Sequence, residues 1–170
     1  EDFVDGADDV VFDSTYKIYV FQLINIHPSV DGAILQFQVS DDGGSSYGVT
    51  LTSSSFRAYQ TEAGGSATLA YIAGQDVAAG TGFAPISQEH GTDANQTGSG
   101  ELFIYHPSDA ATYETQYLNR YMVSQNSEYS MSFYSGGYFA SGTAIDAVQF
   151  KMVSTGNLDL GFITLYGLST

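Results

Sequence analysis

The segment that most constrains the fold of this chain is Ala144–Leu168, which reads AIDAVQFKMVSTGNLDLGFITLYGL. Two apolar stretches flank a polar Ser-Thr-Gly-Asn turn, and in the first stretch Val148, Phe150 and Met152 alternate with other side chains. Alternation of this kind places one face of a β-strand against a core and the other face in water. We therefore expect two antiparallel strands, joined as a hairpin, that close a β-sandwich.

A second hairpin is predicted near the other end of the chain. Ile34–Ser40 (ILQFQVS) directs Leu35, Phe37 and Val39 to one side and glutamines to the other. An Asp-Asp-Gly-Gly turn follows, and Tyr47–Leu51 is the expected returning strand. Before them, Tyr16–Ile26 (YKIYVFQLINI) is apolar on both faces, which indicates a central strand covered on both sides.

The rest of the chain also favours strands over helices. Phe and Tyr are abundant, with 11 and 13 copies, and 19 Gly with 3 Pro suit tight turns. Further strands are expected at Arg57–Gln60, Leu69–Ile72, Glu101–Tyr105, Tyr113–Val123 and Glu128–Tyr134, with a turn at Gly136–Gly137. Residues 1–170 are therefore predicted to form one all-β domain, a two-sheet, jelly-roll-like β-sandwich of about ten antiparallel strands.

Two regions lack a clear strand pattern. Residues 1–13 form an acidic lead-in with a short apolar piece. Residues 73–100 are rich in Gly, Ala, Ser, Thr and Gln, and predict a long polar surface loop with a short strand near Phe83–Ile86. A loop of this length is unusual in a compact domain and is often functional. His90 lies within it and is expected to be solvated.

The charge of the chain excludes several classes of partner. Four basic and 19 acidic residues give a net charge of -15, which disfavours nucleic acid and anionic membrane surfaces. No apolar run is long enough to cross a bilayer, so membrane insertion is not expected. The absence of Cys excludes disulfides and thiolate chemistry. Because the chain begins with Glu1, we expect a processed protein or a piece of a longer one.

One local motif predicts a turn of defined geometry. Ser40, Asp42, Gly44, Ser46 and Tyr47 match the Asp-box pattern Ser-x-Asp-x-Gly-x-Ser-aromatic. The carboxylate accepts backbone amides of the turn, glycine adopts a positive φ, and the aromatic ring packs beneath. We interpret this single copy as a structural turn.

Catalysis is not predicted, and no catalytic residue is assigned. No nucleophile motif is present, and no pair among the 19 acids stands out as an acid–base couple. His27 and His106 each precede Pro at the end of an expected strand, and they could share a metal with His90 only if they met at one rim. No cofactor is expected, apart from a calcium ion at Asp5, Asp8 and Asp9 as the alternative to a solvated acidic loop.

An aromatic row is the remaining candidate site. Tyr113, Tyr117 and Tyr121 fall on one face of a strand, where they could form an interface or stack on a glycan. The competing interpretation is that they belong to the core.

Four segments of the chain resemble virion structural and tail-fibre-associated β-sandwich proteins of tailed bacteriophages, particularly marine ones. They are Asp13–Tyr47, Ser54–Gly64, Gly100–Tyr113 and the terminal Ala144–Leu168. The resemblance implies a non-enzymatic structural protein of the virion, in the tail, fibre or capsid surface. It also implies contacts with other virion proteins and with copies of the same chain, and it transfers no catalytic residue. The alternative is a carbohydrate-binding jelly-roll module or host-glycan adhesin.

Overall fold

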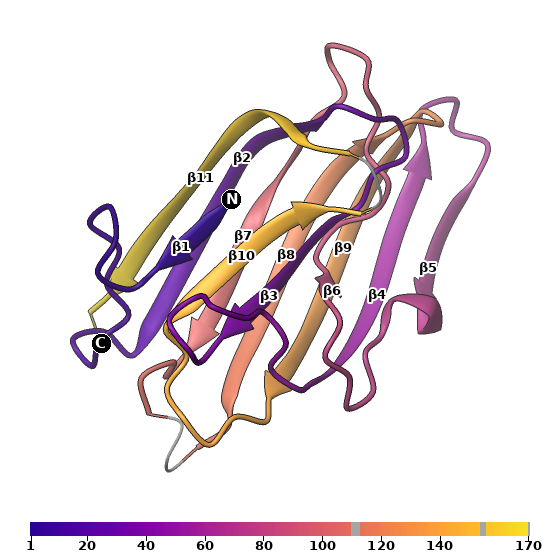
Figure 1. Ribbon diagram of the computed structural model, residues 1–170. Helices are drawn as coiled ribbons and strands as arrows, with labels where there is room; N and C mark the ends of the chain where they lie inside the picture. Colours follow the sequence, from indigo (N-terminus) through magenta and orange to yellow (C-terminus); the bar gives the residue numbers. More distant parts are fainter. Residues whose placement is uncertain (110–112, 154–155, 170) are drawn as a thin grey trace.

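The computed structural model describes residues 1–109, 113–153 and 156–169, which form two antiparallel sheets packed face to face (Figure 1). The smaller sheet contains, in order, β1 (Asp2–Val4), β10 (Ala147–Met152), β3 (Leu35–Ser40) and β6 (Ala84–Pro85). The larger sheet contains, in order, β11 (Leu158–Leu168), β2 (Ile18–Pro28), β7 (Gly98–Tyr105), β8 (Thr115–Gln125), β9 (Tyr129–Phe139), β4 (Leu51–Thr61) and β5 (Ala67–Tyr71). The predicted all-β sandwich is confirmed, with eleven strands in the described part of the chain.

The core lies between the sheets and contains the side chains that the alternation selected. Leu35, Phe37, Val39, Val148, Phe150 and Met152 are all buried. The register of β3 against β10 places Phe37 beside Phe150 on the inner face. From the larger sheet, Phe21 approaches Phe150 and Tyr117 approaches Phe37, with ring centroids 5.1 and 4.9 Å apart. Edge-to-face aromatic contacts therefore join the two layers.

Both predicted hairpins are wrong, and of the expected returning strand Tyr47–Leu51 only Leu51 lies in a strand, as the first residue of β4. β10 pairs with β1 and β3 in the smaller sheet, whereas β11 pairs with β2 in the larger one. In the same way, β3 lies in the smaller sheet, whereas the next strand along the chain, β4, lies in the larger sheet. Each connection therefore crosses from one sheet to the other. The two strands that it joins cover the same core from opposite sides. Ser154 and Thr155 of the predicted terminal turn lie outside the described residues.

The predicted turn at Gly136–Gly137 is also wrong, since both glycines lie within β9. A Cβ atom on Gly137 would collide with the carbonyl oxygen of Thr52 in β4. Gly137 therefore permits close approach of neighbouring strands instead of reversing the chain.

The segment 73–100 is not simply a polar surface loop. It begins with one turn of 3-10 helix, η1 (Ala73–Gln75), and contains β6 at the position expected for a short strand. Ala84, Ile86, Gln88 and His90 are buried, so the middle of the segment packs against the sandwich. Backbone bonds to β3 and the residues before it explain this, because Ile86 N–H donates to Leu35 and His90 N–H donates to Ala33.

Both ends of the chain are part of the sandwich. The acidic lead-in contributes β1 to the edge of the smaller sheet, and Phe12 is buried.

No helix in the described ranges is long and apolar enough to cross a membrane.

Candidate functional site: the outer face of the larger sheet

The outer side of the larger sheet carries large apolar side chains that are open to solvent. In β8, Leu118 and Met122 point outward and are 50% and 56% exposed, while Tyr117 and Tyr121 point inward and are buried. Nine of these exposed side chains form what we call the apolar face: Ile24, Phe56, Leu69, Tyr71, Leu118, Met122, Tyr138, Tyr166 and Leu168. Leu160 and Phe162, at the other end of β11, line a separate pocket and are not counted in it. A strand face that points to water is normally polar, so this surface departs from the usual pattern.

Cross-strand register assembles the apolar face from strands that are distant in the sequence. Tyr166 of β11 lies beside Val20 of β2, which is followed by Phe103 of β7 and Leu118 of β8. At the far side, Phe56 of β4 stacks on Tyr134 of β9, with ring centroids 5.0 Å apart and planes inclined by 10°. The face therefore extends across the whole width of the sheet.

The apolar face is almost free of charge. Over the four central strands β7, β8, β9 and β4, only Glu101 and Arg120 are charged among the outward-pointing residues. Arg120 Nη2 donates to Glu101 Oε2 at 2.7 Å, so the two charges neutralise one another. A chain with a net charge of -15 thus presents one broad surface with no net charge.

A shallow depression of about 570 Å³ lies in this face around the ion pair. It is lined by Gln22, Ile24, Ser99, Glu101, Arg120, Met122 and Tyr134. The small side chain of Ser99 leaves room between the larger residues on each side.

On the inner side of β7 and β8, His90 and Tyr121 form a polar pair that is buried away from solvent. A Cβ atom on Gly98 or Gly100 would collide with the Tyr121 ring, so both glycines make room for that ring. Tyr121 Oη lies 2.9 Å from His90 Nε2, and His90 Nδ1 lies 3.2 Å from the carbonyl oxygen of Ala33. Burial lowers the pKa of His90 to about 4, so the imidazole is neutral near pH 7. The prediction that His90 is solvated is therefore wrong.

The Asp-box residues form a hydrogen-bonded turn between β3 and β4. Asp42 Oδ1 accepts from Ser40 Oγ at 2.8 Å and from Ser46 N–H at 2.9 Å, while Ser46 Oγ donates to Asp42 Oδ2. Gly44 has a φ of 76° and its N–H donates to Ser40 Oγ. The Tyr47 hydroxyl is buried and has no hydrogen-bond partner in the part of the chain that the structure describes. Hydrogen bonds from Ser46, first from its hydroxyl and then from its N–H, lower the pKa of Asp42. The carboxylate is thus engaged in holding the chain where it crosses between sheets.

The acidic lead-in does not assemble the expected calcium ligands. Asp5 Oδ1 accepts from Phe12 N–H at 2.8 Å, which directs this carboxylate into its own loop. Asp8 and Asp9 both have positive φ values, and they line the wall of a separate hollow beside β11. No group of three potential metal ligands is found among the residues that the structure describes. The suggested site at Asp5, Asp8 and Asp9 therefore lacks the geometry that it requires.

The predicted tyrosine row is divided by the fold. Tyr113 lies in the loop before β8 and is 62% exposed. Tyr117 and Tyr121 are buried, and burial raises the pKa of Tyr117 to about 12. Two of the three rings therefore cannot reach a glycan or a neighbouring subunit, and the row is wrong as a binding site.

The histidines that precede proline also lie apart. β2 and β7 are antiparallel, with Ile18 opposite Tyr105 and Ile26 opposite Gly98. His27 near the end of β2 and His106 after β7 are consequently at opposite ends of the sandwich. A metal site formed by these two residues and His90 is excluded by this topology.

The apolar face was missed at the sequence level, although one signal was present. Tyr117-Leu118 and Tyr121-Met122 make β8 apolar on both sides, which only a strand covered on both faces should be. The same double pattern in β2 led to the expectation of two-sided cover. No model of a protein family, no curated protein and no solved structure matches this chain.

Proposed function

We propose that this protein is a non-enzymatic structural subunit of a tailed-bacteriophage particle, part of the tail, fibre or capsid surface. In this proposal the apolar face contacts neighbouring virion proteins, including further copies of the same chain. The phage origin rests on the resemblance of Asp13–Tyr47 and Ala144–Leu168 to virion β-sandwich proteins. The assembly role rests on the structure of the larger sheet.

The observation that carries the assembly role is the apolar face itself. Soluble monomers rarely expose a large contiguous apolar surface, and such surfaces commonly mark contacts with other proteins. Aromatic residues and Met are enriched at the centre of interfaces, where charged residues are depleted. Tyr71, Tyr138, Met122 and the stacked Phe56–Tyr134 pair give the face this composition.

The charge distribution supports contact between like subunits. Two copies with a net charge of -15 repel one another over most approaches. Approach through the apolar face brings together only the neutral Glu101–Arg120 pairs at its centre. Repulsion between the remaining carboxylates is screened over about 8 Å at physiological ionic strength, so attachment should strengthen with salt if the subunits are identical.

Three titratable groups of the chain, His90, Asp42 and Glu101, have structural partners, which supports a non-enzymatic role. His90 is sealed against Tyr121, Asp42 accepts the hydrogen bonds of its turn, and Glu101 pairs with Arg120. A general acid or base needs access to substrate and a pKa suited to proton transfer. The His90 imidazole lacks that access, since its residue is completely buried.

The proposal is tested on particles. Antibody raised against the recombinant chain should label purified phage particles from the source of the sequence at a fixed, symmetric set of positions. Particles without label, or with a single isolated copy, would contradict the structural role. A parallel hydrolase screen on polysaccharides should show no turnover, and turnover that Glu101→Gln abolishes would overturn the non-enzymatic assignment.

A further inference from the structure

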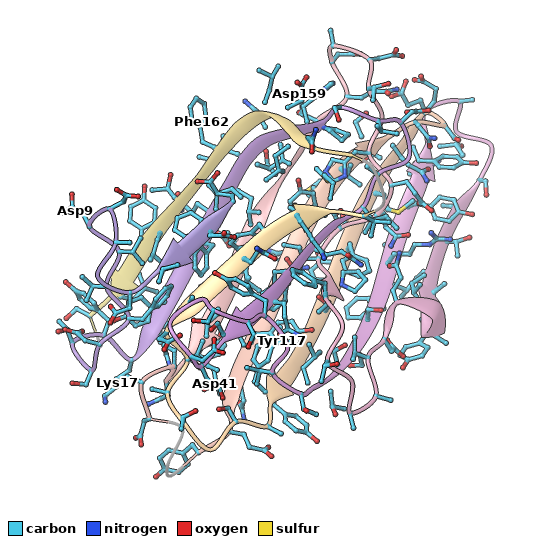
Figure 2. The ribbon with its side chains drawn as sticks, in the orientation of Figure 1. Asp9, Lys17, Asp41, Tyr117, Asp159 and Phe162 are labelled. Atoms are coloured by element: carbon cyan, nitrogen blue, oxygen red, sulfur yellow. The ribbon has the colours of Figure 1, made fainter. Side chains whose placement is uncertain are left out.

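A second surface feature lies at one end of the larger sheet, where β2 and β11 meet the loop of residues 92–97. It is an open pocket of about 630 Å³. Its lining includes Asn25, His27, Asn95, Thr97, Leu160 and Phe162. Phe162 is 70% exposed and Leu160 is 68% exposed, and both belong to β11 where its register against β2 shifts. Figure 2 shows Phe162 projecting away from β11 and Asp159 at the same end of the strand.

A bulge shared by two strands builds the floor of this pocket. Asn25 has a φ of 52°, and the register of β2 shifts against both β7 and β11 at this point. The bulge leaves two consecutive side chains, Ile24 and Asn25, exposed instead of alternating. Across from it, Gly161 has a φ of 113°, and a Cβ there would lie 2.8 Å from the Asn25 carbonyl oxygen. Bulges and left-handed residues other than glycine concentrate at functional sites, where they redirect side chains.

The opposite wall is a loop that is fixed in place. Gln96 is buried, and its N–H donates to the Asp93 carbonyl oxygen at 2.8 Å. Ser124 N–H of β8 donates to the Thr97 carbonyl oxygen at 3.1 Å. Asn95 sits on this anchored loop with its side chain exposed. The pocket is thus formed before any ligand arrives, which lowers the entropy cost of binding.

His27 forms the buried base of the pocket. Both of its ring nitrogens are covered and have no hydrogen-bond partner among the described residues. Its Nδ1 lies 3.8 Å from Asp159 Oδ2, and the Asp159 side chain is exposed to solvent. Both ring nitrogens of His27 are buried, so the imidazole does not itself meet the solvent.

The chemistry of the lining defines the ligand. Phe162 and Leu160 offer an apolar platform, while Asn25 and Asn95 offer amide donors and acceptors and Thr97 offers a hydroxyl. A sugar ring presents the matching combination, since its C–H faces stack on aromatic rings and its hydroxyls bond to amides. The strongly acidic chain disfavours sulfated, phosphorylated or sialylated glycans. We propose that this pocket binds a neutral glycan, a property that goes beyond the assembly role of the apolar face.

The test uses saturation-transfer NMR on the intact chain with five probes. Dextran, mannan, galactan and laminarin are the neutral polysaccharides, and heparin is the anionic one. The wild-type protein should give transfer to at least one neutral polysaccharide and none to heparin. Phe162→Ala should weaken that binding by about tenfold or more, equal to about 1.4 kcal/mol. Phe56→Ala, which removes an exposed ring at the far side of the sheet, should leave the binding unchanged.

The outcomes that overturn the proposal are distinct. They are transfer to none of the four neutral polysaccharides, preference for heparin, and neutral-glycan binding that survives Phe162→Ala or is lost equally in Phe56→Ala. Self-association that Phe162→Ala abolishes without any glycan signal would assign the pocket to a second copy of the chain instead. Because Phe162 is largely exposed, its removal should leave thermal unfolding unchanged, and Asn95→Ala provides a second variant on the opposite wall.

Discussion

The two outer faces of this sandwich differ, although the same alternating pattern produced both sheets. On the smaller sheet, Gln36, Gln149 and Lys151 point outward, and loops cover Gln38, whose amide donates to three backbone carbonyls. On the larger sheet the corresponding positions hold Leu118, Met122 and Phe56. Solubility explains the polar face, but it does not explain the apolar one. The outer surface of the larger sheet therefore meets a requirement other than folding, which we propose is contact with a partner.

The largest expected effect separates the core from the apolar face. Phe150→Ala should lower the free energy of unfolding by about 3–5 kcal/mol, because the ring is fully buried between the sheets. Phe56→Ala should cost less than about 1.5 kcal/mol, because that ring only stacks on Tyr134 and is partly exposed. Urea denaturation of the two variants measures both values. Equal losses would mean that the apolar face is part of the core and not a free surface.

The burial of His90 between the sheets can be tested by measuring stability as a function of pH. His90 has a pKa of about 4 in the folded protein, below the ordinary value of 6.5, because burial disfavours its charged form. Between these two values the unfolded chain binds a proton that the folded chain does not. The folded state should therefore lose about 3 kcal/mol of stability as pH falls from 6.5 to 4.

The matched variant for this experiment is His90→Gln, which removes the titrating ring. At pH 6.5 its free energy of unfolding should be lower than that of the wild type, because the contact with Tyr121 changes. That free energy should vary less than in the wild type as pH falls to 4. Thermal denaturation at several pH values provides the measurement. If both proteins show the same pH dependence, the imidazole is accessible to water and the interior is not sealed.

The connection that carries the chain from the polar sheet to the apolar one depends on Asp42. Asp42→Ala should lower the melting temperature, because amide and hydroxyl donors of the turn lose their acceptor. Glu114→Ala, which removes an exposed carboxylate from another loop, is the control and should change little. Because the folded pKa of Asp42 is lowered, its contribution is present above the ordinary carboxyl pKa and is lost as pH falls through the folded value. A variant that keeps full stability but loses a binding activity would refute the structural interpretation.

The sequence predicted which residues face the core better than it predicted which strands are neighbours. Phe37 and Phe150 were placed correctly because period-two alternation is a local property of a strand. Their sheet partners were not, because proximity in the sequence favours hairpins, whereas both connections cross between layers. Tyr117 and Tyr121 were placed on one face, but alternation alone does not say whether that face points inward. The glycines of β9 and the position of His90 depend on close approach of distant segments, which a single sequence does not display.

The candidate surfaces were less predictable than the fold. The apolar face combines residues from six strands, so it exists only once register and sheet order are known. The pocket beside Phe162 depends on a bulge between Asn25 and Gly161, and neither residue type identifies a bulge by itself. By contrast, the Asp-box turn is contained within Ser40–Tyr47, and its pattern was visible from local spacing alone.

The smallest effect on stability is expected when one charge is placed on each outer face. Met122→Glu and Gln36→Glu should each change the free energy of unfolding by less than about 0.5 kcal/mol, since both positions are at least partly exposed. Their effects on association should differ, because only Met122→Glu introduces an unpaired charge into the apolar face. Sedimentation equilibrium over a range of concentrations compares the two. Identical association of both variants with the wild type would remove the functional distinction between the faces.

Whether a partner covers the apolar face in the assembled state can be measured through thiol reactivity, because the chain contains no Cys. In the proposed virion, Met122→Cys or Lys151→Cys places one unique thiol of this chain on the outer face of the larger or the smaller sheet respectively. Both isolated variants should react with a maleimide at similar rates. On the particle, we expect Met122→Cys to be protected and Lys151→Cys to remain reactive. Equal labelling of both thiols on the particle would contradict the account.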